Sequence, residues 1–61
     1  MSDTERELLR LLGSGLTDDT AGQRLGVSSR TVNRLMASIM ERLGASSRFE
    51  AGIKAAHKGW L

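Results

Sequence analysis

The sequence of 61 residues contains no cysteine, no proline and no tyrosine, and only one phenylalanine and one tryptophan. Without cysteine, the chain can form neither a disulfide nor a thiolate metal site. Its longest apolar run is far shorter than the roughly 20 residues that a membrane-spanning helix needs, and no secretory signal is present. We therefore expect a cytoplasmic protein with no membrane partner, whose stability comes from the packing of its core.

The abundant residue types favour helix. Leucine, alanine, arginine, glutamate and methionine are good helix formers, and no stretch alternates apolar and polar residues as a half-buried strand does. A chain of this length can build one modest core, which is enough for one domain. The composition predicts a single all-α domain over residues 1–61.

The stretch from Arg24 to Leu43 organises the rest of the chain. Within it, apolar residues recur at intervals of four, three and four, which places them on one stripe of a helix. The residues of this stripe are Val32, Met36, Ile39 and Leu43. The residues on the opposite side are Arg30, Asn33, Arg34, Ala37 and Glu41. The sequence thus predicts a long helix over about residues 28–43, with one face in the core and the other free to bind.

A tight turn precedes this helix. Ser28 suits the N-cap, because its hydroxyl can accept a hydrogen bond from a free N–H of the first turn. Gly26 suits the left-handed conformation that follows a helix ending at Leu25. A short helix, a glycine corner and a capped second helix are typical of a helix-turn-helix, in which the second helix reads the ligand.

Two capping boxes predict where the first and last helices begin. Ser2 and Glu5 have the spacing of such a box, with each side chain bonding the backbone of the other. Ser47 and Glu50 repeat the spacing and open a fourth helix that runs to about Lys58. The chain therefore has four predicted helices.

The helix before the turn is short and weak. It is predicted from Leu16 to Leu25, with Thr17 as its cap. Gly22 lies inside it and costs about 1 kcal/mol relative to alanine, unless a neighbouring helix must approach closely there. A close approach is what the crossing of two helices in a helix-turn-helix requires.

The charges are distributed unevenly along the chain. Residues 1–23 carry two arginines and five carboxylates, a net charge of −3, whereas residues 24–61 carry seven basic and two acidic groups, a net charge of +5. One interpretation is a chance scatter of solvated charges. The other is a basic half that docks on a polyanion.

The fourth helix has more apolar surface than one contact needs. One stripe consists of Phe49, Ile53, Ala56 and Trp60, and a second of Ala51, Gly52 and Ala55. A terminal helix on a small domain buries one face against its own core, so the first stripe is a candidate interface with a second copy. The alternative is one wide buried arc with Trp60 folded back as a lid.

Several short motifs occur in the order and spacing of one known family. They are Gly15-Leu16-Thr17, Gly22, Leu25-Gly26-Val27-Ser28, Thr31-Val32, Leu43-Gly44 and Arg48-Phe49-Glu50-Ala51. With these motifs the chain resembles the LuxR-type (GerE-like) DNA-binding domain over nearly its whole length. A lone helix-turn-helix pattern is a weak signal, but this many elements in order make a specific one.

The resemblance implies a four-helix (tetrahelical) domain of a bacterial transcription regulator, whose third helix enters the major groove of double-stranded DNA and whose fourth helix makes a homodimer. The base contacts that it implies come from positions corresponding to Arg30, Asn33 and Arg34, and in some members from the position of Ala37. The phosphate contacts that it implies come from positions corresponding to Thr17, Ser28, Ser29 and Thr31. The helical periodicity independently places the four base-contact positions on the outward face.

The sequence departs from the family pattern in places that matter for specificity. Thr20 stands where the family usually has glutamate, which removes a capping box, and Ala21 replaces a large aliphatic residue. Asn33 replaces a frequent lysine, and Leu35 a frequent histidine or aromatic residue. The base preferences of other members therefore do not transfer to this chain.

The side chains of the outward face have known partners in DNA. An arginine fork can bond O6 and N7 of guanine, and an asparagine amide can bond N6 and N7 of adenine. We expect Arg34 and Asn33 to read an adjacent guanine and adenine, the alternative for each being a phosphate contact or solvent alone. Ala37 either meets a thymine methyl or avoids a clash, and we prefer the second. At helix starts, Thr17 and Ser28 suit a phosphate, while capping alone is the simpler role for Ser28.

Nothing in the sequence indicates catalysis, a cofactor or a metal. His57 is the only histidine, and a lone histidine in the last turn of a helix is usually solvated or interacts with the helix dipole. No glycine-rich nucleotide loop is present. We therefore expect a protein that is not an enzyme.

Other interpretations stay open. The same scaffold could bind a protein partner through its apolar fourth helix, or it could read promoters like region four of a sigma factor, which does not require the motif that begins at Arg48. Met1 falls where the family usually has an interior leucine, which indicates a C-terminal effector domain attached to a sensor or receiver domain. A free-standing regulator is the alternative.

Overall fold

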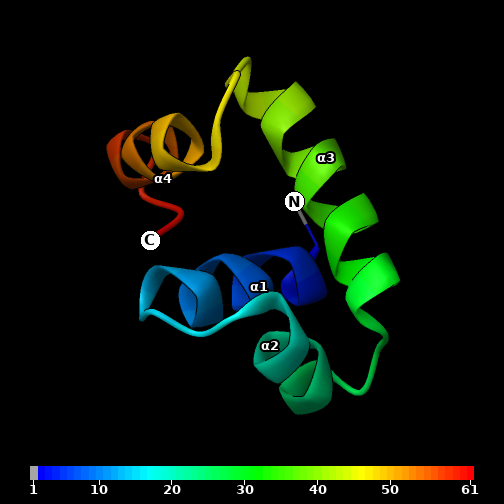
Figure 1. Cartoon of the computed structure of the whole chain (residues 1–61). Helices are drawn as coiled ribbons and strands as arrows, with labels where there is room; N and C mark the ends of the chain where they lie inside the picture. Colours follow the sequence, from blue (N-terminus) through cyan, green and yellow to red (C-terminus); the bar gives the residue numbers. More distant parts are fainter. Residues whose placement is uncertain (1) are drawn as a thin grey trace.

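Four helices make up the fold of residues 2–61, the part of the chain that the computed structural model describes. They are α1 (Asp3–Gly13), α2 (Asp18–Leu25), α3 (Ser29–Leu43) and α4 (Arg48–His57). Figure 1 shows α1 lying across the middle of the molecule, with α2 below it, α3 along one side and α4 on the other. The all-α, four-helix prediction is confirmed. Met1, which corresponds to an interior leucine of the family pattern, lies outside the described residues.

The core is built around the predicted apolar stripe of α3. Its fully or nearly buried side chains are Leu8, Leu9, Leu11, Ala21, Val32, Met36, Ile39, Leu43, Ala51 and Ala55. The four α3 residues in this set are those that the periodicity predicts, and α1, α2 and α4 each contribute to the same cluster. Burial of this whole face holds α3 in place and leaves its other face to the solvent.

The turn between α2 and α3 has the predicted geometry. Gly26 adopts φ +75° after the end of α2, and the Ser28 hydroxyl accepts a hydrogen bond from the backbone N–H of Thr31. At Gly22, a Cβ atom would lie 2.7 Å from the carbonyl oxygen of Val27 and 3.3 Å from Cγ2 of Val32. The close approach predicted at this glycine is therefore real, and it explains why α2 carries no side chain there.

The capping box at the start of α1 is complete and extends to α3. The Ser2 hydroxyl accepts from the backbone N–H of Glu5, and the Glu5 carboxylate accepts from the backbone N–H of Ser2. Glu5 is the one buried charged residue of the described chain, and it forms an ion pair of 3.4 Å with Arg42. Hydrogen bonds from Ser2, and then the nearby Arg42, hold the pKa of Glu5 below its ordinary value of 4.5.

This depressed pKa predicts how stability responds to acid. A carboxylate whose pKa is lowered by folding stabilises the folded state above its ordinary pKa, and that contribution is lost as the pH falls through the lowered value. Glu5→Gln keeps the capping hydrogen bonds but removes the charge, so it should cost about 0.5–1 kcal/mol near neutral pH. In urea unfolding, the difference between the two proteins should shrink as the pH falls below the ordinary Glu5 pKa of 4.5 and vanish below the lowered pKa. A difference that persists in acid would contradict the assignment.

Three details of the helix ends differ from the prediction. α2 begins at Asp18 and not at Leu16, because Thr17 is extended and caps the helix while Leu16 packs against the core. The sequence predicted no capping box on α2, because Thr20 replaces glutamate. The Thr17 hydroxyl nevertheless accepts a hydrogen bond from the backbone N–H of Thr20, so one of the two hydrogen bonds of such a box is present. At α4, Ser47 is the cap, but the Glu50 carboxylate accepts a hydrogen bond from the backbone N–H of Ser46 at 2.6 Å.

Among residues 2–61, none of the helices has the length and hydropathy that a membrane span requires.

Candidate nucleic-acid interface

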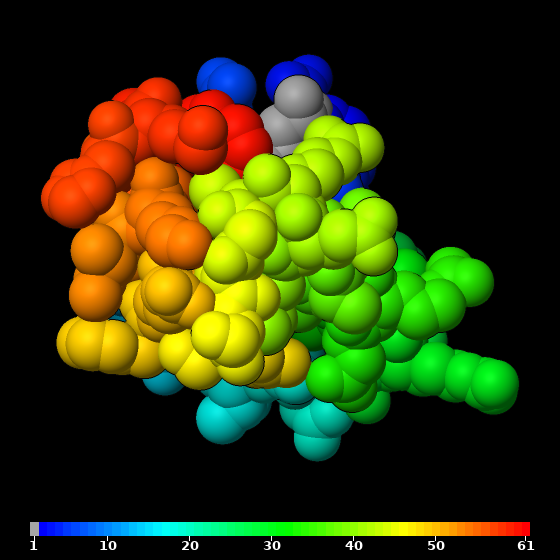
Figure 2. All heavy atoms as spheres, turned by 90° about the horizontal axis from the view of Figure 1, so that it is seen from above, coloured from blue at the N-terminus to red at the C-terminus, as the bar shows by residue number. Residues whose placement is uncertain are grey.

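The outward face of α3 is exposed along its first half. Arg30, Asn33, Arg34 and Ala37, the four predicted base-contact residues, are all exposed, and Glu41 follows them on the same side. In Figure 2, the green side chains from the start of α3 project beyond the body of the molecule. The side chains are therefore free to enter a groove without any rearrangement of the core.

The positive charges on this face are not neutralised by the protein. Four basic residues elsewhere form ion pairs, namely Arg10 with Glu7, Arg42 with Glu5, Arg48 with Asp18 and Lys54 with Glu50. Within residues 2–61, no carboxylate lies within ion-pair distance of Arg24, Arg30 or Arg34. These three arginines lie at the end of α2 and the start of α3, so the helix-turn-helix carries three of the five basic side chains that form no ion pair in the described chain.

Asn33 differs from the two arginines beside it, because it is held in place. Its Nδ2 donates to the backbone carbonyl of Ser29 at 3.0 Å, and its Oδ1 accepts from Nη2 of Arg48 at 3.2 Å. Asn33 is therefore anchored to both α3 and α4. Arg48 was recognised in the sequence only as part of a motif, and nothing in its spacing pointed to Asn33, which lies 15 residues earlier.

Arg48 is itself fixed by Asp18 of α2. Its two terminal nitrogens donate to the two carboxylate oxygens of Asp18 at 2.5 Å and 2.8 Å, a bidentate pair. The hydrogen bonds and charge of Arg48 hold the pKa of Asp18 below its ordinary value of 3.8, and the same hydrogen bonds raise the pKa of Arg48. Both groups are therefore charged at neutral pH, and the charges of the pair do not change there.

The predicted phosphate-contact residues cluster at two helix N-termini. Thr17 caps α2, and Ser28 caps α3 beside Ser29 and Thr31. The Ser28 hydroxyl also donates to Oγ1 of Thr31 at 3.2 Å. Capping uses the hydroxyls, but the first backbone N–H groups of a helix still favour an anion. α2 and α3 thus present two such ends, and Arg30 lies in the first turn of α3.

The predicted dimer residues fall into two groups. Phe49 is 81% exposed and Ile53 is 45% exposed, and Ala56 is also exposed. Trp60 is half-buried against the core, with Nζ of Lys58 5.9 Å from its ring centroid. The second stripe behaves differently, because Ala51 and Ala55 are fully buried. α4 therefore uses the alanine stripe for its own core and leaves Phe49 and Ile53 open.

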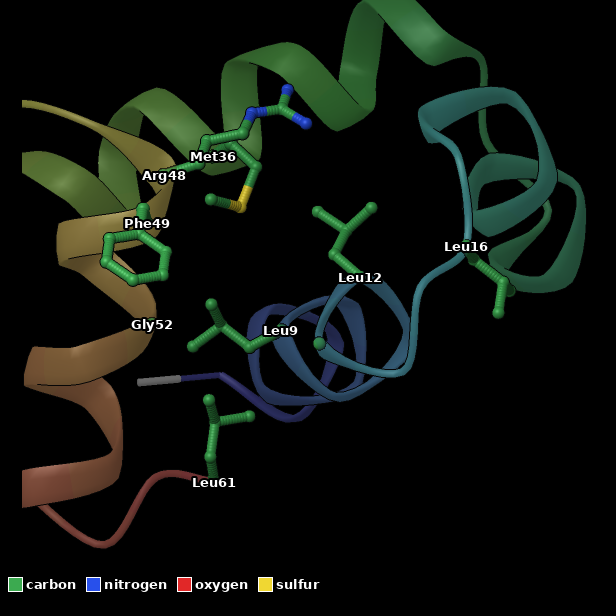
Figure 3. Close-up of a pocket in the computed structure, with 9 residues that line it drawn as sticks. Leu9, Leu12, Leu16, Met36, Arg48, Phe49, Gly52 and Leu61 are labelled. Carbon is green, nitrogen blue, oxygen red and sulfur yellow. The ribbon is translucent and has the colours of Figure 1, made fainter.

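An apolar pocket of about 360 Å³ lies beside the exposed Phe49. It lies between α1, α4 and the C-terminal tail. Figure 3 shows Leu9 and Leu12 from α1 and Leu61 from the tail pointing toward the space next to Phe49. The Arg48 guanidinium extends away from Phe49, toward α2. The pocket adds apolar surface to the exposed side of α4.

No cluster of three or more histidine, aspartate or glutamate side chains that could hold a metal ion occurs in residues 2–61. His57 is exposed at the end of α4, as its position in the sequence predicts.

Comparison with known proteins gives the family of this chain. The family described as "Bacterial regulatory proteins, luxR family" matches residues 1–55. The bialaphos biosynthetic pathway regulatory protein of Streptomyces hygroscopicus is 45% identical over 92% of this chain and 22% of its own length. The transcriptional regulatory protein DesR of Bacillus subtilis is 33% identical over the whole chain and 31% of its own length. YdfI, another transcriptional regulatory protein of Bacillus subtilis, is 43% identical over 95% of the chain and 28% of its length.

The chain thus spans between about a fifth and a third of the length of these curated relatives. No solved structure gives a significant match. The family consists of transcription regulators and not of enzymes, which confirms the expectation from the sequence. With a helix-turn-helix of the expected geometry and a family match over nearly all of its residues, the chain belongs to the luxR family of bacterial regulatory proteins, as a LuxR-type DNA-binding domain.

Proposed function

We propose that this domain binds double-stranded DNA at specific sequences, with α3 inserted in the major groove. The observation that carries the proposal is the outward face of α3, where Arg30 and Arg34 are exposed and without an ion-pair partner in the described chain. The opposite face of the same helix is buried, so α3 can dock as a rigid rod. The major groove admits an α-helix and presents a distinct pattern of donors and acceptors for each base pair.

Each residue of this face has a role in the proposal. Arg30 and Arg34 bond O6 and N7 of guanine, while Asn33 bonds N6 and N7 of adenine. Ala37 is small and lets α3 approach the base edges without a clash. Together they read a short half-site, in which each correct bidentate contact is worth about 1–3 kcal/mol of discrimination.

Backbone phosphates fix the register of the helix in the groove. The residues that we assign to them are Thr17, Ser28, Ser29 and Thr31, at the N-termini of α2 and α3. Free N–H groups and the positive end of the helix dipole favour an anion at such ends. Arg24 adds charge beside them and extends the phosphate contacts beyond the predicted set.

The proposal is tested by titrating labelled duplex DNA with the domain at increasing salt. Because each neutralised phosphate releases counterions, a dimer with roughly four charged contacts should bind about 100-fold more weakly at about 200 mM than at about 50 mM salt. A complex with no salt dependence, or no complex with any duplex, would contradict the proposal.

We also propose that the domain acts as a homodimer through α4, with Phe49, Ile53, Ala56 and Trp60 at the interface. Phe49 and Ile53 are large apolar side chains left open to solvent, and their burial by a second copy would remove an unfavourable exposed surface. A two-fold dimer would present two α3 helices to half-sites about one helical turn apart, roughly 34 Å.

Replacement of Phe49 by alanine should weaken this dimer by about 10-fold or more, because the lost apolar contact is worth about 1.5–3 kcal/mol. Sedimentation equilibrium measures the dissociation constant, and binding to a two-half-site duplex should lose its cooperativity in parallel. Phe49→Leu keeps an apolar side chain and is the matched control, expected to stay close to wild type. An unchanged dissociation constant in Phe49→Ala would place the interface elsewhere.

The lengths of the relatives support a larger regulator. They are three to five times longer than the region that matches this chain, so we propose that residues 1–61 correspond to an effector domain at the C-terminal end, with a sensor or receiver domain in cis. A regulator of transcription works where the bacterial chromosome lies, and we accordingly place this one in the cytoplasm.

A further inference from the structure

We infer that Arg48, the first residue of α4, fixes the orientation in which Asn33 meets its base pair, and so helps to set sequence specificity from outside the reading helix. The inference rests on the proposed function, since it takes Asn33 to face DNA. Arg48 is a positioning residue in this account, because it acts through Asn33 and needs no contact with a base.

The contacts form a chain across three helices. Asp18 of α2 holds the Arg48 guanidinium through both carboxylate oxygens. Nη2 of the same guanidinium then donates to Oδ1 of Asn33 on α3 at 3.2 Å. Asp18 is the more enclosed partner of the ion pair, with 26% of its side chain exposed against 46% for Arg48. The guanidinium is planar and its bidentate pairing fixes that plane, so the donor aimed at Asn33 is fixed as well.

The carboxamide of Asn33 is held at both ends. Its Oδ1 faces Arg48, and its Nδ2 faces the carbonyl of Ser29, one helical turn earlier. An exposed asparagine without such partners exchanges among rotamers, and rotation of its carboxamide swaps the positions of the oxygen and the nitrogen. It would then present its acceptor and donor to a base in either order. The two hydrogen bonds select one orientation before DNA arrives, which lowers the entropy cost of binding.

The anchored amide retains what adenine needs. A carboxamide has two N–H donors and two lone pairs on its oxygen, and the two contacts use one of each. One donor and one lone pair remain, and a bidentate contact with N7 and N6 of adenine needs one of each. Within residues 2–61, no side-chain hydrogen bond holds Arg30 or Arg34 in the same way. On this face, the side chain of Asn33 is therefore oriented before DNA binds, whereas the side chains of Arg30 and Arg34 can change rotamer to fit the bases.

The test compares three substitutions on the best duplex and on duplexes changed at single base pairs. Asn33→Ala should lose discrimination at one base pair, by about 10-fold. Arg48→Lys keeps the positive charge but removes the bidentate guanidinium. It should lose at least half of this 10-fold discrimination at the same base pair, while the salt dependence of binding stays unchanged. In the double variant, Arg48→Lys should add no further loss at that pair. Arg42→Lys is the matched control, because Arg42 also pairs with a carboxylate, that of Glu5, and should leave discrimination intact.

A second readout needs no DNA. In the free domain, the side-chain amide protons of Asn33 should show NMR chemical shifts displaced from free-amide values and slowed exchange with solvent, and Arg48→Lys and Asp18→Asn should each bring both quantities toward free-amide values. Circular dichroism confirms that each variant is folded.

The outcomes separate the inference from the function on which it rests. If the wild type binds no duplex, the proposed function fails, while unaltered Asn33 amide signals in Arg48→Lys refute the anchor itself. If Asn33→Ala loses discrimination and Arg48→Lys does not, Arg48 does not position Asn33 although the domain still reads DNA. If Arg48→Lys discriminates better than wild type, the anchor holds Asn33 away from DNA and the inference is wrong.

Discussion

Replacement of both Arg30 and Arg34 by alanine should lower DNA affinity by about 100-fold or more and remove preference at two base pairs of each half-site. Each residue supplies a fork for guanine that is worth about 1–3 kcal/mol, and neither is engaged with a carboxylate of the described chain. Their removal costs the protein no internal ion pair, so the fold should be unaffected. Fluorescence anisotropy with the best duplex measures the loss.

The control removes two charges from elsewhere. Arg6 on α1 and Lys58 after α4 are exposed and form no ion pair in residues 2–61, and Arg6→Ala with Lys58→Ala reduces the net charge by the same amount. Binding in this variant should fall only slightly, through long-range electrostatics. Equal losses in the two double variants would mean that net charge alone binds DNA.

The same pair of arginines separates the competing functions. A domain that served only to bind a protein through the apolar side of α4 would keep that binding in Arg30→Ala with Arg34→Ala, and it would have no DNA affinity to lose. The family match favours DNA over that alternative. It also disfavours a sigma-factor reader, since the luxR family match extends into α4.

The largest effect on stability is expected at Gly22. Gly22→Val should destabilise the fold by about 3 kcal/mol, because its Cβ alone would lie 2.7 Å from the backbone oxygen of Val27, and overpacking of this kind costs about 1–3 kcal/mol or more. A backbone atom cannot give way as a flexible side chain can. For a small domain with a total stability of about 5 kcal/mol, this loss would remove more than half of the free energy of unfolding and raise the unfolded fraction about 100-fold.

Gly52→Val is the matched control. Gly52 also lies inside a helix, but nothing lies within 4 Å of the Cβ that it would gain, so the substitution should be neutral or slightly stabilising. Urea unfolding of both variants measures the difference. Equal stability of the two would mean that α2 and α3 do not approach as closely as the structure indicates.

Local patterns in the sequence predicted most of the fold. The buried stripe of α3 follows from its periodicity, and the ends of α1 and α3 follow from Ser2, Ser28 and the glycine after Leu43, because caps act within a few residues of each other. The errors were small and also local. The Glu50 carboxylate, for example, bonds the residue before the cap, a shift that spacing alone does not reveal.

The anchoring of Asn33 could not be predicted, because it depends on residues far apart in the chain. Asp18 and Arg48 are 30 positions apart, and only the packing of α2 and α4 against α3 brings them together. Similarly, the periodicity of α4 grouped Trp60 with Phe49, but α4 ends at His57 and Trp60 is partly buried against the core, so the two side chains differ in exposure although both stay in the proposed interface. Periodicity predicts which residues lie on the same face of a helix, but it does not apply to residues beyond the end of that helix.

The most direct test of the central claim, that the outward face of α3 reads bases, is a selection of duplexes from a random pool by the wild-type domain and by Asn33→Ala. The account predicts an enriched motif with two half-sites about one helical turn apart, and in the variant a loss of preference at one base pair of each half-site with the rest of the motif unchanged. Recovery of no motif by the wild type, or of an identical motif by both proteins, would contradict it.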